Sequence, residues 1–296
     1  MHVVVGGASG FLGTALVAHL RRQGHQVTRL VRSDDTSSDA SQWDPRTGRV
    51  DQIVIDRADA VVNLSGSSVG RWPRTGRVRR ELLASRIDAT TTLARAVGAS
   101  ENKPALMSGS AMGIYGPDRG DEVLTETSEP GTGFLSELVQ RWEQAAQPAV
   151  DAGSRVCWLR TTLALERGGG LLGPLLPMFK VGAGARLGDG RQYMAMVSLH
   201  DWLRAVTFLI EHPTASGPFN IGMPNPPTNA EFTDALGDAL SRPTLLVAPT
   251  IVLRTVLGSV ADDLLGSLRL DSPALREAGF TFDHENIDEA LEAALR

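Results

Sequence analysis

The sequence predicts an α/β protein: a doubly wound, Rossmann-like parallel sheet with a smaller C-terminal α+β substrate domain. A β-branched run at residues 3–5 leads directly into a glycine-rich turn. A helical stretch at 14–23 and a second strand at 26–31 follow that turn. Strand and helix patterns then continue to alternate along the chain, which is typical of βαβ units with right-handed crossovers.

The glycine-rich turn reads Gly7-x-x-Gly10-x-x-Gly13. In a dinucleotide-binding fold, one such glycine allows the sharp exit from the strand. Another lets the backbone approach a pyrophosphate, and a third allows the helix to pack closely on the sheet. The helix would direct its N–H groups and the positive end of its dipole at the phosphates. A tight strand–helix turn without a ligand is the alternative interpretation.

The second strand ends at Arg32 and Ser33, where a Rossmann fold meets the adenosine ribose. An acidic residue here would bind the ribose 2′-hydroxyl of NAD, whereas an arginine can pair with the 2′-phosphate of NADP. The sequence therefore predicts NADP(H). Asp34 and Asp35 follow closely and could weaken the preference, and a solvated loop arginine is the alternative.

A further strand at 59–64 ends in small residues, with Leu64, Ser65 and Gly66 at the point where a flat dinucleotide could lie against the backbone. An ordinary strand-end turn explains these residues equally well. The next strand, from residue 106, ends in hydroxyl residues and a tyrosine. Because the carboxyl ends of central strands carry the chemistry in such sheets, Ser110 and Tyr115 are the candidate catalytic residues.

The remaining elements follow from hydrophobic spacing and turn signals. We expect helices at 78–97, 134–152, 202–210 (with Asp201 as N-cap), 230–240 (capped by Asn229) and 287–295, and strands at 155–165 and 219–222. The glycine-rich stretch 166–192 is expected to cross between domains. The predicted dinucleotide-binding domain is 1–165, with 196–222 returning to it. The substrate domain is 166–195 and 223–296.

Composition limits the partners. The formal net charge of −5 argues against nucleic acid or a membrane as partner, and the basic run at 70–80 is interpreted as a loop entering a helix. The only cysteine, Cys157, allows no internal disulfide and lies in an apolar run, so we expect a core thiol and a reducing, cytoplasmic location. The six histidines show no metal-ligand spacing, and no metal site is predicted.

Beyond these patterns, short motifs occur along the whole chain, at 6–13, 63–66, 85–86, 108–116, 125–126, 134–135, 142–143, 159–161, 168–170, 187–192, 200–201 and 229–232. Together they resemble the NAD-dependent epimerase/dehydratase group of the extended short-chain dehydrogenase/reductase superfamily, in particular its "epimerase family protein" subfamily. The resemblance implies bound NADP(H) and adds three cofactor-lining positions. With these, the predicted cofactor-binding residues are Gly7, Ser9, Gly10, Phe11, Leu12, Gly13, Arg32, Ser33, Leu64, Ser65, Gly66, Glu81, Arg86, Ser108 and Leu163.

The chain departs from the superfamily at its catalytic motif, Tyr-x-x-x-Lys. Neither tyrosine has a lysine four residues on, and Leu135 and Val139 stand at about the motif's positions. The lysine normally lowers the tyrosine pKa from about 10 so that the phenol can act as acid or base. Tyr115 with Arg119 could form a displaced pair, although a structural tyrosine is the better interpretation.

Two functions remain open. The first is an NADP(H)-binding epimerase or oxidoreductase acting on an unknown small molecule without the usual tyrosine–lysine pair. The alternative is a non-catalytic NADP(H)-binding sensor or regulatory protein, including one with a role in cell division. The substrate and the oligomeric state do not follow from the sequence.

Overall fold

The structure, a computed structural model, describes residues 1–33, 35–69, 73–258 and 260–296. Asp34 and the start of the basic run, 70–72, lie outside the described residues. Two compact units can be distinguished. The first comprises Met1–Ser110, Leu138–Arg160 and Ala205–Phe219, and the second comprises Ala111–Glu137, Thr161–Arg204 and Asn220–Arg296. These units are compact groups of residues, and the substrate-domain boundaries expected from the sequence stay a prediction.

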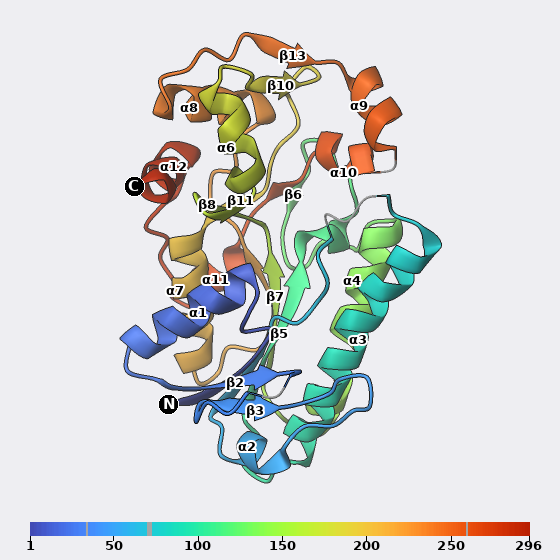
Figure 1. Ribbon diagram of the computed structural model, residues 1–296, viewed down its shortest axis with the longest axis vertical. Coiled ribbons are helices and arrows are strands. Elements are labelled where there is room, and N and C mark those ends of the chain that lie inside the picture. Colours follow the sequence, from blue (N-terminus) through green and yellow to red (C-terminus); the bar gives the residue numbers. More distant parts are fainter. Residues whose placement is uncertain (34, 70–72, 259) are drawn as a thin grey trace. The chain divides into compact units, whose positions relative to one another are not determined.

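A seven-stranded sheet forms the centre of the first unit, in the order β12-β7-β5-β4-β1-β2-β3 (Figure 1). Its strands are β1 (His2–Gly6), β2 (Gln26–Val31), β3 (Ala40–Gln42), β4 (Ala60–Asn63), β5 (Ala105–Ala111), β7 (Val156–Thr161) and β12 (Gly217–Ile221). The pairings that join β5, β4, β1, β2 and β3 are all parallel. The strand order reverses at β1, beside which doubly wound sheets bind ligands. The predicted fold class is confirmed.

Helices flank this sheet on both faces. They are α1 (Phe11–Arg22), α2 (Gln52–Asp56), α3 (Gly76–Ala99), α4 (Phe134–Gln144), α5 (Gln147–Asp151) and α7 (Leu199–Glu211). One core joins side chains of α2, α3 and α5 to the sheet, among them Leu93, Val97 and Val61, all fully buried. Figure 1 draws α1 and α3 on opposite sides of the sheet. Strand β1 is apolar on both faces, with Val3, Val4 and Val5 fully buried, as expected for a central parallel strand.

In its described residues, the second unit contains three small sheets and several short helices. Its elements are η1 (Met112–Tyr115), β6 (Val123–Leu124), β8 (Leu163–Glu166), β9 (Gly169–Gly170), α6 (Leu172–Lys180), β10 (Ala185–Leu187), β11 (Met196–Ser198), α8 (Asn229–Ala239), β13 (Leu246–Ala248), α9 (Thr250–Leu257), α10 (Val260–Leu265), β14 (Arg269–Leu270), α11 (Pro273–Glu277) and α12 (Ile287–Leu295). Its core includes Phe179, Met196, Phe232 and Leu291. The predicted α+β character of this part is thereby confirmed.

Two expected helix caps are wrong. Helix α7 begins at Leu199, so Asp201 lies in its first turn, and the Asp201 N–H donates to the Oγ of Ser198 at 3.1 Å. Helix α8 is capped by Thr228, whose side chain and that of Glu231 form a reciprocal capping box. In both cases a hydroxyl residue further upstream takes the capping position.

Two expected elements are divided. The predicted strand 155–165 forms β7 and β8, because the chain changes partner: Thr162 still bonds to the carbonyl of Ile221, whereas Leu163 begins to pair with β11. The predicted helix 134–152 forms α4 and α5. Proline 148 stands at the start of α5, where its missing N–H is tolerated.

Candidate cofactor site

The glycine turn joins β1 to α1. At two of its glycines, neighbouring backbone atoms lie so close that no side chain could be accommodated. Gly7 has a φ of +79°, and a Cβ there would lie 2.6 Å from the carbonyl carbon of Leu64. A Cβ at Gly13 would lie 2.1 Å from the carbonyl oxygen of Gly7. Both distances are too short for any side chain. Gly7 thus lets the ends of β1 and β4 meet, and Gly13 lets α1 start against the turn.

Gly10 differs from the other two. It is the N-cap of α1, with an extended backbone (φ −78°), and a Cβ there would have one neighbour, the Gly7 carbonyl oxygen at 3.3 Å. Ser9, Gly10 and Phe11 are exposed, and Leu12 is half-buried. The first turn of α1 carries no acidic side chain. Its free N–H groups therefore form a surface that suits an anion.

The carboxyl end of β4 is held from within the unit. The Asn63 side chain is fully buried, donates to Thr90 Oγ1 at 2.8 Å, and accepts from the Ser65 N–H at 3.1 Å. The Leu64 N–H donates to the carbonyl of Gly6. The Ser65 hydroxyl is buried without a partner among the described residues. Such an oxygen is costly to leave unpaired, so this strand end fits a polar ligand.

Arg86, on α3, is a buried cation beside this strand end. It is 8% exposed, donates to the carbonyls of Leu82 and Ser67 at 3.2 and 3.0 Å, and stacks 5.0 Å from the Trp142 ring. Burial lowers the pKa of its guanidinium to about 10. Its Nε has no hydrogen-bond partner and the charge no carboxylate partner in the described part of the chain. A buried charge of this kind favours a nearby anion.

The other predicted cofactor residues are more dispersed. Arg32 and Ser33 are exposed after β2, and Glu81 forms an ion pair with Arg77 at 3.0 Å. Ser108 is fully buried in β5. Leu163 lies in β8 of the second unit.

Ser110, the first catalytic candidate, belongs to a buried polar network of the first unit. Its hydroxyl donates to Glu143 Oε1 at 2.6 Å, and Arg160 binds both carboxylate oxygens of Glu143 at 2.9 and 3.1 Å. Since the single proton of this hydroxyl is directed at a carboxylate, Ser110 can offer only lone pairs to a ligand. It suits a ligand hydroxyl or amide better than a carbonyl.

Tyr115, the second candidate, is fully buried in the second unit. Its hydroxyl donates to Asn220 Oδ1 at 2.6 Å, and the Asn220 amide donates to the carbonyl of Asp271 at 2.8 Å. Arg119 contacts the Tyr115 main-chain oxygen at 3.5 Å and pairs with Glu122. These contacts favour the structural interpretation of Tyr115, because Arg119 contacts its main-chain oxygen and its hydroxyl donates to Asn220.

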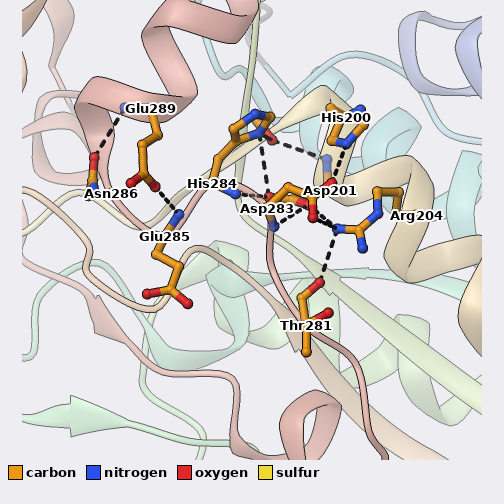
Figure 2. Close-up of polar contacts among 10 residues, drawn as sticks. His200, Asp201, Arg204, Thr281, Asp283, His284, Glu285, Asn286 and Glu289 are labelled. Atoms are coloured by element: carbon orange, nitrogen blue, oxygen red, sulfur yellow. Dashed lines mark hydrogen bonds and ion pairs between the residues drawn. The ribbon is translucent and has the colours of Figure 1, made fainter.

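Figure 2 shows a second charged cluster, which ties residues 281–284 to α7. Asp201 is fully buried and accepts from the N–H groups of Asp283 and His284 at 3.0 and 2.8 Å. Arg204 pairs with Asp201 at 2.7 Å and with Asp283 at 3.1 Å, and His200 pairs with Asp283 at 2.8 Å. His200, Asp201 and Asp283 offer ligand atoms within 4.8 Å, a proximity that the histidine spacing did not reveal. Arg204 already pairs with both carboxylates, and this cation beside the ligand atoms disfavours a metal ion there.

Among the described residues, every helix is too short or too polar to cross a membrane.

The comparisons with known proteins define the class of this chain. Residues 3–222 match the NAD dependent epimerase/dehydratase family, and residues 248–294 match DUF1731, a domain of unknown function. The chain belongs to the NAD-dependent epimerase/dehydratase family. The family resemblance inferred from the motifs is confirmed.

Particular relatives are similar over nearly the whole chain. Epimerase family protein Mb2239 of Mycobacterium bovis is 43% identical over 291 residues, which cover 98% of this chain and 96% of that protein. The human epimerase family protein SDR39U1 (isoform 2), crystallised with NADPH, is 30% identical with a TM-score of 0.89, covering 99% of each chain. A nucleoside-diphosphate sugar epimerase from Corynebacterium glutamicum is 32% identical with a TM-score of 0.83. This chain covers 58% of that longer one.

Proposed function

We propose that this chain binds NADP(H) on the glycine turn and acts as an epimerase- or oxidoreductase-like protein on a small molecule. The observation that carries the proposal is the difference among the three turn glycines. Gly7 and Gly13 are required by backbone contacts within the protein. A Cβ at Gly10, at the N-terminus of α1, would meet only the Gly7 carbonyl oxygen at 3.3 Å, a tight contact that a small shift of that carbonyl would relieve. Gly10 is therefore the glycine that the fold requires least, and a ligand that approaches the backbone closely would explain it.

Further features of the first unit support the cofactor. The α1 N-terminus would hold the pyrophosphate, and the lone pairs of Ser65 and Ser110 would accept from ribose or amide groups. Arg86 would supply positive charge beside the β4 end. Arg32 would pair with the 2′-phosphate. NADPH in the human relative, 30% identical over nearly the full length, agrees with this choice.

This chain offers fewer acid–base side chains for a chemical step than is usual in the superfamily. Bound NADP(H) would supply hydride transfer. The first unit adds a serine whose proton is committed to Glu143, and Val139, at about the usual lysine position, is buried and inert. Ser110 would therefore orient a hydroxyl of the ligand rather than protonate a carbonyl. The substrate is an unidentified small molecule.

A non-catalytic NADP(H)-binding sensor is the second candidate function. The observation that favours it is Tyr115, whose hydroxyl is fully buried and bonded to Asn220. No other tyrosine is available to replace it except Tyr193, which packs its ring against the guanidinium of Arg269.

Two measurements separate these functions. Titration calorimetry with NADPH tests the cofactor, and a panel of carbonyl compounds and nucleotide sugars, followed by nicotinamide absorbance, tests turnover. Saturable NADPH binding with turnover of one panel member supports the enzyme. Binding and thermal stabilisation without any turnover support the sensor, and absence of NADPH binding contradicts both.

A further inference from the structure

The loop that follows β2 contains carboxylates that oppose the proposed NADP(H) preference. Asp35 and Asp39 lie close behind Arg32 in the sequence, before β3 returns to pair with β2. Unpaired carboxylates near a 2′-phosphate would repel it, and would instead suit the 2′-hydroxyl of NAD. The structure shows what neutralises them.

Arg29, near the middle of β2, binds both acids. Its Nε and Nη2 donate to the two oxygens of Asp39, each at 2.9 Å, and its Nη2 contacts Asp35 Oδ2 at 3.3 Å. Arg21 of α1 also binds Asp39, and the Arg29 N–H donates to the Asp39 carbonyl at 2.7 Å. Asp35 in addition accepts from the N–H and hydroxyl of Ser37 at 2.9 and 2.5 Å. We call this group of Arg21, Arg29, Asp35 and Asp39 the β2 clamp.

The β2 clamp is balanced in charge. The Arg29 hydrogen bond is the main cause that holds the pKa of the Asp39 carboxyl well below its usual range, and the Ser37 hydroxyl does the same for Asp35. Both acids are therefore ionised at neutral pH, and two arginines neutralise them. Among the residues that the structure describes, the two acids of the β2 clamp pair with Arg21 and Arg29 and not with Arg32.

We propose that Arg29 is a specificity-determining positioning residue: by holding Asp35 and Asp39, it keeps the end of β2 positive and so favours a 2′-phosphorylated cofactor. Arg29 itself does not touch the cofactor. This inference rests on the proposed NADP(H) binding. It explains how two acids next to Arg32 are compatible with that cofactor.

The test uses the full-length protein and calorimetric titration with NADPH and NADH. Arg29→Met should raise the NADPH Kd about three- to tenfold, because Asp35 and Asp39 then keep only Arg21 as a partner, and one negative charge near the doubly charged phosphate is left uncompensated. The NADH Kd should change less than twofold. Adding Asp39→Asn to Arg29→Met should restore most of the NADPH affinity, which a merely structural role of Arg29 would not do. Arg57→Met is the matched control, because Arg57 is exposed and precedes β4, at the amino-terminal end of the parallel strands and away from the carboxyl end where β2 meets Arg32.

Asp39→Asn alone keeps the inference testable should Arg29→Met not fold. It releases Arg29 from its main partner and should tighten NADPH binding about two- to fivefold, with NADH binding unchanged. Equal NADPH-to-NADH ratios in wild type and both variants would overturn the role of Arg29 while leaving the cofactor proposal intact. Failure of the wild-type protein to bind NADPH would overturn the proposed function and this inference together.

Discussion

Replacing the turn glycines one at a time separates the cofactor's demands from those of the fold. In Gly13→Ala, the new methyl would lie 2.1 Å from the Gly7 carbonyl oxygen and 3.0 Å from the Ala8 Cα, so backbone must move. Overpacking of this kind costs about 1–3 kcal/mol. In Gly10→Ala, the nearest atom is 3.3 Å away. The loss of an N-cap glycine is then roughly offset by the stiffer unfolded chain, for a net change of about 0.5 kcal/mol or less.

The two variants should therefore behave in opposite ways. In urea unfolding, Gly13→Ala should lose about 1–3 kcal/mol and Gly10→Ala almost nothing. In calorimetric titration, Gly10→Ala should bind NADPH at least about tenfold more weakly, a loss of about 1.4 kcal/mol, because its methyl occupies the space of the pyrophosphate. Wild-type NADPH affinity in a folded Gly10→Ala protein would refute the reasoning, as would wild-type stability of Gly13→Ala.

Other predictions concern single side chains. Arg32→Asp should weaken NADPH binding strongly and NADH binding little, and titration calorimetry with equal losses for both would count against the 2′-phosphate assignment. Asp201→Asn should lower the free energy of unfolding by about 2 kcal/mol in urea, because the amide removes the buried charge that pairs with Arg204 and leaves one oxygen to accept from two backbone N–H groups. An unchanged midpoint would contradict a stabilising role of Asp201. The hydrogen bond with His200 is the main cause that lowers the pKa of the Asp283 carboxyl. The His200–Asp283 pair therefore stabilises the fold at pH values above the usual carboxyl pKa, and this stabilisation is lost as the pH falls through the lowered pKa of Asp283. His200→Gln should flatten the loss of stability in acid, and an unaltered acid slope would argue against the pair. Burial raises the pKa of the Cys157 thiol to about 11, so a thiol reagent at pH 8 should label Cys157 only after unfolding, and rapid native labelling would contradict a core position.

The sequence was sufficient to predict those features of the fold that depend on residues close together in the chain. The valines of β1 and the spaced glycines that follow specify a strand, a turn and a helix within a few residues of one another. Gly24, with a φ of +84°, follows the end of α1 as its position suggested. The fold class follows from repeating such units, because parallel strands require helical crossovers.

The sequence was insufficient to predict the hydrogen-bond partners of side chains when those partners lie far away along the chain. Ser110 finds Glu143 33 residues away, and Tyr115 finds Asn220 105 residues away. These contacts decide whether each hydroxyl is available to a ligand, and no local pattern encodes them. The different duties of Gly7 and Gly10 likewise depend on the end of β4, which approaches only in the folded sheet.

Some local signals also competed with one another. Asn229 and Thr228 are both good N-caps, and the reciprocal bonds between Thr228 and Glu231 select the threonine. At α7, Asp201 had the composition of a cap, but its carboxylate is required by the N–H groups of Asp283 and His284. A tertiary contact thus outweighed local preference.

The most direct test of the account is the affinity of the purified, full-length chain for NADPH and for NADH, measured by calorimetry under one buffer condition. The account predicts saturable binding of NADPH at one site per chain, with NADH bound at least about tenfold more weakly. Absence of NADPH binding, or equal affinity for both nucleotides, would contradict it.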